Sequence, residues 1–548
     1  MSSVHLRFGH AAGTIKSSLP RYPLQMKRIE LDLSPEQCHD ALLLRDAVAR
    51  SQGLAADALG SAVLVRRTLD CRRRANIVYH CVVELYAPGE ALPSPPRSPL
   101  DGVQLRPDAK RVVIVGAGPA GLFAAIRCLQ RGLKPIVVER GKPVEDRKYD
   151  IARLTHDKLV DADSNWCFGE GGAGTYSDGK LYTRSTKRGD VGAVIRTFVA
   201  FGADPDIMLE AHAHIGTDRL SGIIARMRLA IMEHGGEYRF GSRVTNLDVR
   251  DGRVRGVLLE RQGSSDAIAA DAVILATGHS ARDIYSLFAR RGWQLEAKPF
   301  ALGVRVEHPQ QLINEIQYHG KGYSPCLPAA AYSLTTQVGR HGVFSFCMCP
   351  GGVIVPAATA AGQQVVNGMS NSRRNSQWAN SGIAVTVDLD DLGGSSDPDA
   401  SPALSLLRFQ QAVEERMFHA AGDTVDAPSQ RLTDFLRRRP STSLPRSGYL
   451  GHTVAAPLHE LLPPFVAEGL TQAFKDFDRK MHGFVTDEAL LLAVESRTSS
   501  PVRIPRDKTS LQHPQLESLF PCGEGAGYAG GIVSSALDGI RCAEAIAM

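Results

Sequence analysis

Cys347 and Cys349 stand two positions apart in the segment FSFCMCPGG, residues 344–352, and both carry a thiol that can do chemistry. On a strand, residues two apart point to the same face, so both sulfurs would lie on one side. Such a pair can pass two electrons as a dithiol. A disulfide between residues this close in sequence is strained and easily reduced. The alternative is a buried turn before Pro350 with no part in chemistry.

Two further polar residues are candidates for catalysis. His279 follows the tripeptide at 276–278, and an imidazole that titrates near neutral pH is a candidate proton donor. Arg497 can hold a substrate carboxylate through two parallel hydrogen bonds or contact cofactor phosphates, as can its neighbour Arg503. The alternatives are a hydrogen-bonded structural histidine and a structural ion pair. The candidate catalytic residues are therefore Cys347, Cys349, His279 and Arg497.

The segment that would position such chemistry is VVIVGAGPAGLFAAIRCLQRGLKPIVVE, residues 112–139. Its pattern predicts a strand, a helix that runs through residue 130 and a second strand, which together form a complete dinucleotide fingerprint. Gly116 allows the tight turn, Gly118 lets the backbone approach a pyrophosphate, and Gly121 lets helix and strand pack closely. We therefore expect a Rossmann-like nucleotide-binding domain.

Glu139 and the C-terminal segment indicate which nucleotide binds. At the end of the second strand, Glu139 can accept hydrogen bonds from ribose hydroxyls and would repel a 2′-phosphate, which favours FAD or NAD over NADP. Residues 521–546 predict a glycine-rich turn that leads into a helix. The positive end of that helix would stabilise negative charge on a reduced flavin ring. FAD is therefore the expected cofactor.

Two more segments complete the expected cofactor site. Residues 165–183, NWCFGEGGAGTYSDGKLYT, predict a loop whose glycines let the backbone come close to the cofactor, unless it is a flexible surface loop. The tripeptide at 276–278 follows an apolar strand and would bring its backbone beside the FAD. The predicted cofactor-binding residues are Gly116, Gly118, Pro119, Ala120, Gly121, Glu139, Arg140, Gly172, Gly174, Ser177, Gly179, Val244, Ala276, Thr277, Gly278, Gly523, Glu524, Gly530, Gly531 and Ile532.

Composition sets few further limits. The 548 residues are 43% hydrophobic and 22% charged with a net charge of +5, which is typical of globular protein and neither demands nor excludes nucleic acid. The ten cysteines are scattered and include no C-x-x-C pair, so we expect no zinc site, no metal, and a reducing cytoplasm. No apolar run approaches the roughly 18 residues that a membrane-spanning helix needs.

The expected fold class is α/β, divided along the chain as follows: a disordered extension at 1–25, an α+β module at 26–88, a proline-rich linker at 89–109, the first part of the FAD-binding domain at 110–283, a substrate or cap domain at 284–494, and the C-terminal part of the FAD-binding domain at 495–548. The extension has two other interpretations, an organellar transit peptide or a start assigned too early with Met26 as the true beginning. A single helix is expected after Ser34, its cap.

The N-terminal module is locally basic, with arginines at 66, 67, 72, 73 and 74. These residues predict either an RNA- or phosphate-binding appendage or a solvated hairpin face. No aromatic residues alternate with the arginines to stack on bases, which favours the second interpretation.

Beyond these motifs, the chain resembles the uncharacterised bacterial FAD-dependent dehydrogenase family. The stretches that match are FGEGGAGTYSDGKLYT, HIGTDRL, ATGHSARD, FSFCMCPGG, VVNGMSNSRR, ESRTSSPVRIPRD and CGEGAGYAGGI, and the resemblance spans about Met26 to the C-terminus. It implies a bound FAD, an oxidoreductase activity and a fold of the glutathione reductase type with an inserted α+β cap domain. It implies no particular substrate.

Three classes of function fit these observations. The first is a dehydrogenase or reductase for a small organic substrate, with NAD(P)H as a candidate diffusible electron donor. The second is an RNA-modifying flavoenzyme that holds RNA through its basic module, although nucleic acid is the less favoured partner and no membrane partner is expected. The third is a flavin-dependent monooxygenase that couples NAD(P)H oxidation to oxygen uptake. We rank them in this order.

Overall fold

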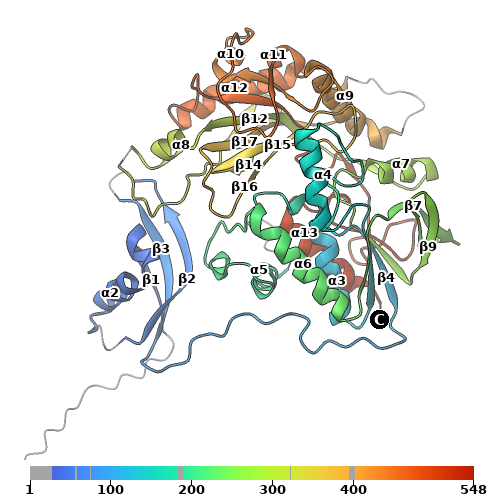
Figure 1. Ribbon diagram of the computed structural model, residues 1–548, viewed down its shortest axis with the longest axis horizontal. Helices are drawn as coiled ribbons and strands as arrows, with labels where there is room; N and C mark the ends of the chain where they lie inside the picture. Colours follow the sequence, from blue (N-terminus) through green and yellow to red (C-terminus); the bar gives the residue numbers. More distant parts are fainter. Residues whose placement is uncertain are drawn as a thin grey trace, which may run out of the picture.

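The computed structural model describes residues 27–55, 59–73, 76–182, 189–320, 322–393 and 401–547, so the predicted extension at 1–25 lies outside the described residues. The chain forms a small N-terminal lobe and a larger body that contains two main sheets (Figure 1). The five-stranded sheet and the elements that cover it make up the nucleotide domain, and the seven-stranded sheet and its helices make up the cap domain.

The sheet of the nucleotide domain is parallel throughout, which confirms the predicted α/β fold with a Rossmann-like domain. Helices pack on one face, and α7 together with a three-stranded antiparallel sheet covers the other. In spatial order the strands are β22 (Leu519–Pro521), β10 (Ala272–Leu275), β4 (Arg111–Val115), β5 (Lys134–Val138) and β6 (Glu237–Arg239). The covering elements are α3 (Pro119–Gln130), α5 (Val191–Ala200), α6 (Thr217–Glu233) and α13 (Ile532–Ala545) on the first face, with β7 (Arg243–Arg250), β8 (Arg253–Arg261), β9 (Ser264–Ala269) and α7 (Arg282–Arg291) on the second.

Two glycines explain how closely the helices approach the sheet and each other. A Cβ on Gly121 would lie 1.9 Å from the carbonyl oxygen of Gly116, so only glycine lets α3 pack against the turn after β4. A Cβ on Gly539 would lie 2.0 Å from the carbonyl oxygen of Ala120, so α13 packs against α3 in the same way. The last helix of the chain is thereby held beside the first helix of the fingerprint.

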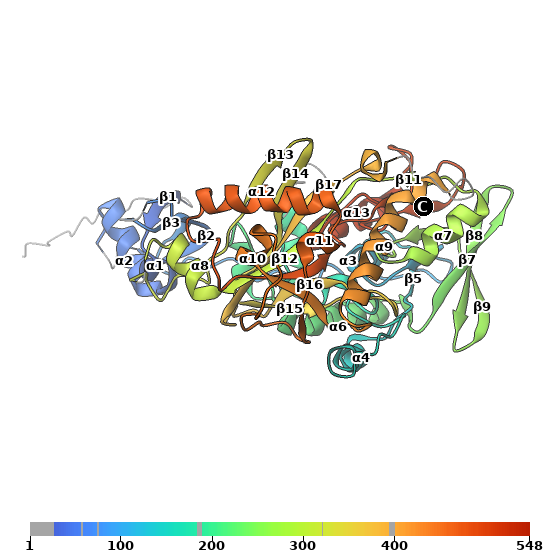
Figure 2. The same ribbon diagram turned by 90° about the horizontal axis from the view of Figure 1, so that it is seen from above.

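The cap domain is built on a mixed sheet of seven strands, antiparallel except for its last pair. Figure 2 shows α12 (Pro464–Lys480) on one side of this sheet and the hairpin of β15 (Gly352–Pro356) and β16 (Val366–Ser370) on the other. In order the strands are β13 (Thr335–Val338), β14 (His341–Cys349), β17 (Trp378–Val387), β12 (Phe300–Pro309), β20 (Leu490–Glu495), β18 (Ala427–Arg431) and β19 (Thr453–Ala455), and the other helices of the domain are α8 (Gln310–Gln317), α9 (Ser405–Ala420), α10 (Leu432–Leu436) and α11 (Leu458–Leu461).

The border between the two domains is occupied by α7 and a short pair of strands. The predicted start of the cap domain at residue 284 falls inside α7, whose buried residues pack into the core of the nucleotide domain, while the cap sheet begins at Phe300. Between them, β11 (Glu296–Ala297) pairs with β21 (Val502–Arg503), so the chain crosses the border twice at one place. A long helix on the nucleotide side, α4 (Val144–His156), packs against β15 of the cap.

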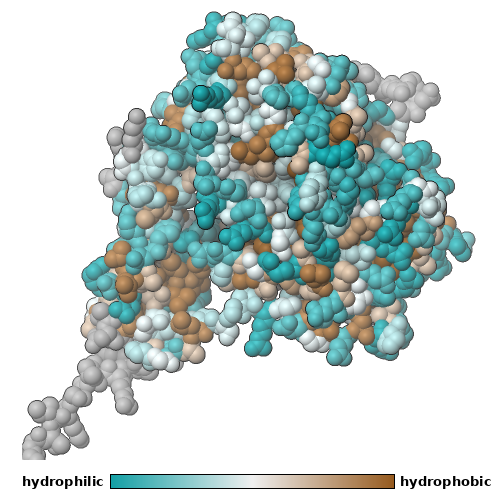
Figure 3. Space-filling model, viewed as in Figure 1, coloured by the Kyte–Doolittle hydropathy of each residue, from teal (hydrophilic) through white to brown (hydrophobic). Residues whose placement is uncertain are grey.

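The N-terminal module is a three-stranded antiparallel sheet with two helices. Its strands are β1 (Lys27–Leu33), β3 (Val78–Tyr86) and β2 (Ser61–Asp70) in spatial order, and it forms a separate lobe at the lower left of the space-filling view (Figure 3). The prediction of a single helix after Ser34 is wrong, because the segment forms two helices, α1 (Pro35–His39) and α2 (Ala41–Gln52). Asp40 between them adopts an extended conformation that ends α1. Its side chain caps α2 by accepting hydrogen bonds from the N–H groups of Leu42 and Leu43. The linker at 89–109 carries no helix or strand.

Among the residues that the structure describes, no helix is long and apolar enough to cross a membrane.

Candidate functional site

A cavity of about 810 Å³ lies where the nucleotide domain meets β14 of the cap domain. Most of the residues predicted for the site line it. Of the predicted catalytic residues, His279, Cys347 and Arg497 are in its wall. The predicted cofactor-binding residues in its wall are Gly116, Gly118, Pro119, Ala120, Glu139, Arg140, Gly172, Gly174, Ser177, Gly179, Val244, Ala276, Thr277, Gly278, Glu524, Gly530, Gly531 and Ile532. Gly121, Gly523 and Cys349 are not part of the wall.

The glycine turns form an open cradle along this cavity. At Gly116, φ is +105° and a Cβ would lie 2.4 Å from the carbonyl oxygen of Ala276, so the turn after β4 packs directly on the turn after β10. At Gly118, by contrast, a Cβ would meet only Gly172 Cα at 3.9 Å, and at Gly530 and Gly531 it would meet nothing within 4 Å. These three backbones therefore face empty space, as a group that binds against bare backbone requires.

Glu139 is buried and ties three loops to the end of β5. Its carboxylate accepts hydrogen bonds from the backbone N–H groups of Ala117 and Gly141, both at 2.9 Å, and of Gly169 at 3.0 Å. Oε1 accepts two of these bonds and Oε2 only one, which leaves acceptor capacity on Oε2. The residue predicted to meet a ribose is therefore also the residue that assembles the turn around it.

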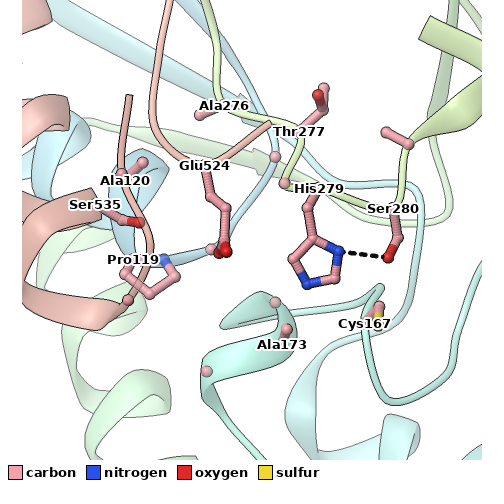
Figure 4. Close-up of a pocket in the computed structure, with 18 of the residues that line it drawn as sticks. Pro119, Ala120, Cys167, Ala173, Ala276, Thr277, His279, Ser280, Glu524 and Ser535 are labelled. Atoms are coloured by element: carbon pink, nitrogen blue, oxygen red, sulfur yellow. Dashed lines mark hydrogen bonds between the residues drawn. The ribbon is translucent and has the colours of Figure 1, made fainter. Parts of the chain in front are cut away.

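Glu524 and His279 point into the same space from two turns that pack on each other, since a Cβ at Gly525 would lie 2.4 Å from the carbonyl oxygen of Gly278 (Figure 4). Burial raises the pKa of Glu524 to about 7, although Lys298 nearby opposes the rise. Burial, Arg497 and Arg282 together lower the pKa of His279 to about 3. His279 is therefore a neutral imidazole at neutral pH, with Nδ1 2.8 Å from Ser280 Oγ and its other nitrogen left for a ligand. It has no imidazolium proton to release, which disfavours the predicted role as a proton donor.

Arg497 is buried, and its guanidinium is fully engaged with protein groups. It bonds both oxygens of Glu414 at 3.2 Å, Thr359 Oγ1 at 2.7 Å, Ser280 Oγ at 3.1 Å and Gln363 Oε1 at 3.0 Å. These contacts use all five N–H donors of an arginine. The structural ion pair, and not the capture of a substrate carboxylate, is the interpretation that this geometry favours.

The C-terminal turn is positioned by a second buried ion pair. Arg506 bonds Asp538 of α13 through two nitrogens, at 2.6 and 2.9 Å, and Asp538 accepts the N–H of Gly523 at 2.8 Å. Asp538 also lies with Cys522 and Cys542 in a buried group of possible metal ligands, but the Arg506 guanidinium already lies 3.3 Å from Cys542 Sγ. A cationic side chain thus already contacts two of the three members of this group, and its pairing with Asp538 helps to fix the turn before α13.

Cys347 and Cys349 lie at the end of β14, and both sulfurs contact one ammonium group. Lys180 Nζ, from the glycine-rich loop, is 3.8 Å from Cys347 Sγ and 3.6 Å from Cys349 Sγ. Cys347 is partly exposed to the cavity, whereas Cys349 is fully buried. The two thiols therefore share a side, as the spacing predicts, but only one of them is accessible.

Several residues that line the cavity are not among the site residues predicted from the sequence. Lys180 and Asp178 belong to the quoted loop, and a lysine among glycines was the available signal. Tyr182 of the same loop and Tyr528 of the C-terminal glycine-rich turn also line the cavity. Lys298 lines it too, but it occurs in a segment without a recognisable motif. Its position depends on how the cap domain lies on the nucleotide domain, which no local pattern reveals.

Two arginines of the basic cluster in the N-terminal module form ion pairs within the protein. Arg67 is buried and contacts Glu210 at 2.6 Å and Asp206 at 3.1 Å, both from the nucleotide domain, and Arg72 contacts Asp70 at 2.7 Å. Arg74 lies outside the described residues. Two of the arginines offered for RNA binding are thus occupied by carboxylates, so the geometry gives the RNA-modifying hypothesis no support.

Comparison with known solved structures gives weak overall similarity. CtdE in complex with FAD is 12% identical with a TM-score of 0.31, over 79% of this chain and 82% of that chain. A geranylgeranyl bacteriochlorophyll reductase-like protein from Thermoplasma acidophilum is 13% identical with a TM-score of 0.32, over 80% of this chain and 77% of that chain.

Comparison at the level of sequence is more informative. The family model described as pyridine nucleotide-disulphide oxidoreductase matches residues 110–289, that of the FAD-dependent protein, C-terminal domain-like, matches 299–498, and a domain of unknown function matches 25–86. Protein FixC of Salmonella typhi is 27% identical over 243 residues, which are 40% of this chain and 48% of that protein. An uncharacterized protein of Clostridium beijerinckii is 42% identical over 440 residues, which are 80% of each chain. The chain therefore belongs to the family of FAD-dependent proteins that this clostridial relative represents, and it is an FAD-dependent oxidoreductase.

Proposed function

We propose that the protein is a dehydrogenase or reductase whose small organic substrate enters the cavity from the side of the cap domain. The observation that supports this most is the shared cavity itself. Its wall combines the bare glycine turns of the nucleotide domain with Phe346 and Cys347 of the cap domain and with Lys298, which lies just before the cap sheet. Its volume of about 810 Å³ falls in the range typical of ligand sites, roughly 300–1,000 Å³.

The residues of the cradle fit FAD. Gly118, Gly530 and Gly531 leave open space beside backbone N–H groups at two helix N-termini, where a pyrophosphate and the electron-rich edge of a flavin are stabilised. The carboxyl group of Glu524 faces the cavity and makes no hydrogen bond within the described part of the chain, so it is available to ligand hydroxyls. Bound there, FAD supplies two-electron transfer to or from the substrate.

Lys298 is the side chain that we propose to orient the substrate. It lines the cavity, and no carboxylate of the described residues forms a salt bridge with it. Burial and the neighbouring Arg503 lower the pKa of its ammonium group. A cation in this position attracts an anionic or strongly polar group of a ligand. The neutral ring of His279, also in the cavity wall, can add a hydrogen bond.

We propose NAD(P)H as the electron donor. Because no second glycine fingerprint follows the first in the sequence, we expect this donor to be a diffusible partner and not to be held in a domain of its own. The ten free cysteines fit a reducing compartment such as the cytoplasm.

Anaerobic titration of the purified holoprotein with NADH and with NADPH tests this function. The expected result is loss of the flavin absorbance with one of the two donors and its recovery on addition of an organic acceptor. If neither donor removes the absorbance, the proposed donor is wrong. If donor oxidation proceeds only with oxygen and yields a hydroxylated product, the protein is a monooxygenase and the proposed reaction is wrong.

A further inference from the structure

The short ribbon at the border between the two domains places Lys298 and Arg503 side by side. In this ribbon Glu296 pairs with Arg503, and Lys298, two residues further on, donates its backbone N–H to the carbonyl oxygen of Pro501 at 2.9 Å. Residues two apart on a strand point to the same face, and so do residues opposite each other on paired strands. Glu296, Lys298 and Arg503 therefore lie on one face of the ribbon.

That face packs on the C-terminal glycine-rich turn of the cavity wall. A Cβ at Gly527 would lie 3.1 Å from Cδ of Lys298 and 3.3 Å from Cβ of Arg503, so both side chains rest on this turn. The guanidinium carbon of Arg503 is 5.8 Å from the centre of the Tyr528 ring. Lys298, Gly527 and Tyr528 all line the cavity. The two cationic side chains therefore stand together at the cavity wall.

Both cationic groups are only loosely held by protein groups. Nζ of Lys298 lies 3.5 Å from Oγ of Ser499, at the outer limit of a hydrogen bond. Nη1 of Arg503 lies 3.6 Å from a carboxylate oxygen of Glu296, and both side chains are more than two-fifths exposed, so this ion pair contributes little. The buried Nε of Arg503 has no hydrogen-bond partner among the described residues.

The surrounding charges favour an anionic ligand at this pair of cations. The neighbouring Arg506 brings its own counter-ion, Asp538, at 2.6 Å. Glu524 is the other carboxyl group near Lys298, and because burial raises its pKa to about 7 it carries only part of a negative charge at neutral pH. Repulsion by Arg503 adds to burial in lowering the pKa of Lys298. A bound anion would relieve this repulsion.

A phosphate group suits two adjacent cations better than a carboxylate does. A phosphate monoester carries close to two negative charges at neutral pH and offers several acceptor oxygens, whereas a carboxylate carries a single charge. Arginine binds phosphate through two parallel N–H donors, and lysine binds it as a point charge.

We propose that Lys298 and Arg503 form a binding site for the phosphate group of a ligand that reacts in this cavity. The inference rests on the proposed function and deepens it, because it names the class of ligand. The phosphate group belongs either to a phosphorylated organic substrate or to the NAD(P)H donor, and the experiment below distinguishes these two sources.

Calorimetric titration of the oxidised holoprotein with phenyl phosphate and with benzoate tests the site. The two probes share a ring and differ in the anionic group. The wild type should bind phenyl phosphate roughly tenfold more tightly than benzoate or better, because phosphate brings an extra charge and extra hydrogen bonds. Lys298→Met and Arg503→Met should each remove most of this preference, and Arg503→Lys should retain part of it. Lys508→Met and Arg291→Met, which remove the same charge at exposed positions, should keep it in full.

Titration of the cofactor-free variants with FAD checks that the two cations do not serve the cofactor instead. Lys298→Met and Arg503→Met should bind FAD as the wild type does. Weaker FAD binding in these variants would assign the two cations to the phosphates of FAD and overturn the proposal. Equal binding of phenyl phosphate and benzoate by the wild type would overturn it as well.

Competition with oxidised nicotinamide nucleotides identifies the source of the phosphate group. If it belongs to the donor, NADP⁺ or NAD⁺ should displace phenyl phosphate from the wild type, and Arg503→Met should weaken the binding of that nucleotide. If it belongs to the substrate, phenyl phosphate should stay bound in the presence of either nucleotide. Either result supports the site. These titrations involve no electron transfer, so a failed titration with NADH and NADPH and a failed phosphate site can be told apart.

Discussion

The ammonium group of Lys180 lies 3.8 Å from the sulfur of Cys347, and this contact joins the glycine-rich loop of the nucleotide domain to the last residues of a cap strand. The two residues are far apart in the sequence and belong to different domains. The reactive wall of the cavity therefore exists only when the two domains are packed together. Stability at the border between the domains and chemistry in the cavity are consequently linked.

Replacing Arg497 should destabilise the protein even without cofactor or substrate. Arg497 and Arg282 outweigh the effect of burial on Glu414 and lower its pKa to about 2, so this carboxylate is charged and depends on both arginines. Arg497→Gln should lower the free energy of unfolding of the cofactor-free protein by about 3–5 kcal/mol, the usual result of leaving a buried charge with too few partners. Urea denaturation measures this loss.

The matched control is the double variant with Glu414→Gln. Because the two side chains bond each other, its destabilisation should be smaller than the sum of the two single effects. If Arg497 instead serves only a substrate carboxylate, the cofactor-free Arg497→Gln protein would unfold like the wild type.

Glu307 should make the stability of the cap domain depend on pH. It lies buried on β12, where its carboxylate accepts the N–H of Gly448 at 3.0 and 3.1 Å, and burial raises its pKa to about 7 from an ordinary value of 4.5. A pKa raised by folding contributes stability that is full below 4.5 and is lost as the pH rises through 7. Relative to the wild type, Glu307→Gln should therefore be more stable at pH 8, on the order of 1–3 kcal/mol, and should lose this advantage near pH 4.5.

Thermal unfolding of both proteins across this pH range measures the difference. Glu488→Gln, at an exposed position, is the control and should follow the wild type at every pH. A constant difference between Glu307→Gln and the wild type at all pH values would contradict the assignment.

Arg67 should control how firmly the N-terminal module docks on the body. Besides its ion pairs with Glu210 and Asp206, its backbone N–H donates to the carbonyl oxygen of Leu209 at 2.8 Å. Arg67→Ala removes two charged hydrogen bonds, so the module should open more often and the linker at 89–109 should be cut by a protease roughly tenfold faster. Arg66→Ala, at the exposed neighbouring position, should leave the cutting rate unchanged. Equal rates for both variants would show that Arg67 does not hold the module.

The sequence predicted best what local patterns determine. Apolar strands next to glycines at fixed spacing revealed the parallel sheet and most of the cavity wall, because the backbone path there depends on the glycines themselves. It predicted less well where a single polar residue redirects the chain, as at Asp40. It could not show that Arg497 is saturated by Glu414, since that pairing brings together segments from α9 and the residues after β20. Lys180 escaped attention for the same reason, because its role depends on the cap strand opposite.

The central claim is that two turns far apart in the sequence, at Gly118 and at Gly531, hold one and the same FAD. A Cβ at Gly118 would meet nothing nearer than 3.9 Å and a Cβ at Gly531 nothing within 4 Å, so Gly118→Ala and Gly531→Ala should fold and melt like the wild type when free of cofactor. The direct measurement is titration of the three cofactor-free proteins with FAD. We expect one FAD per wild-type chain and roughly tenfold or weaker binding in each variant, since a methyl group takes space that the cofactor needs. Wild-type affinity in either variant would contradict the claim.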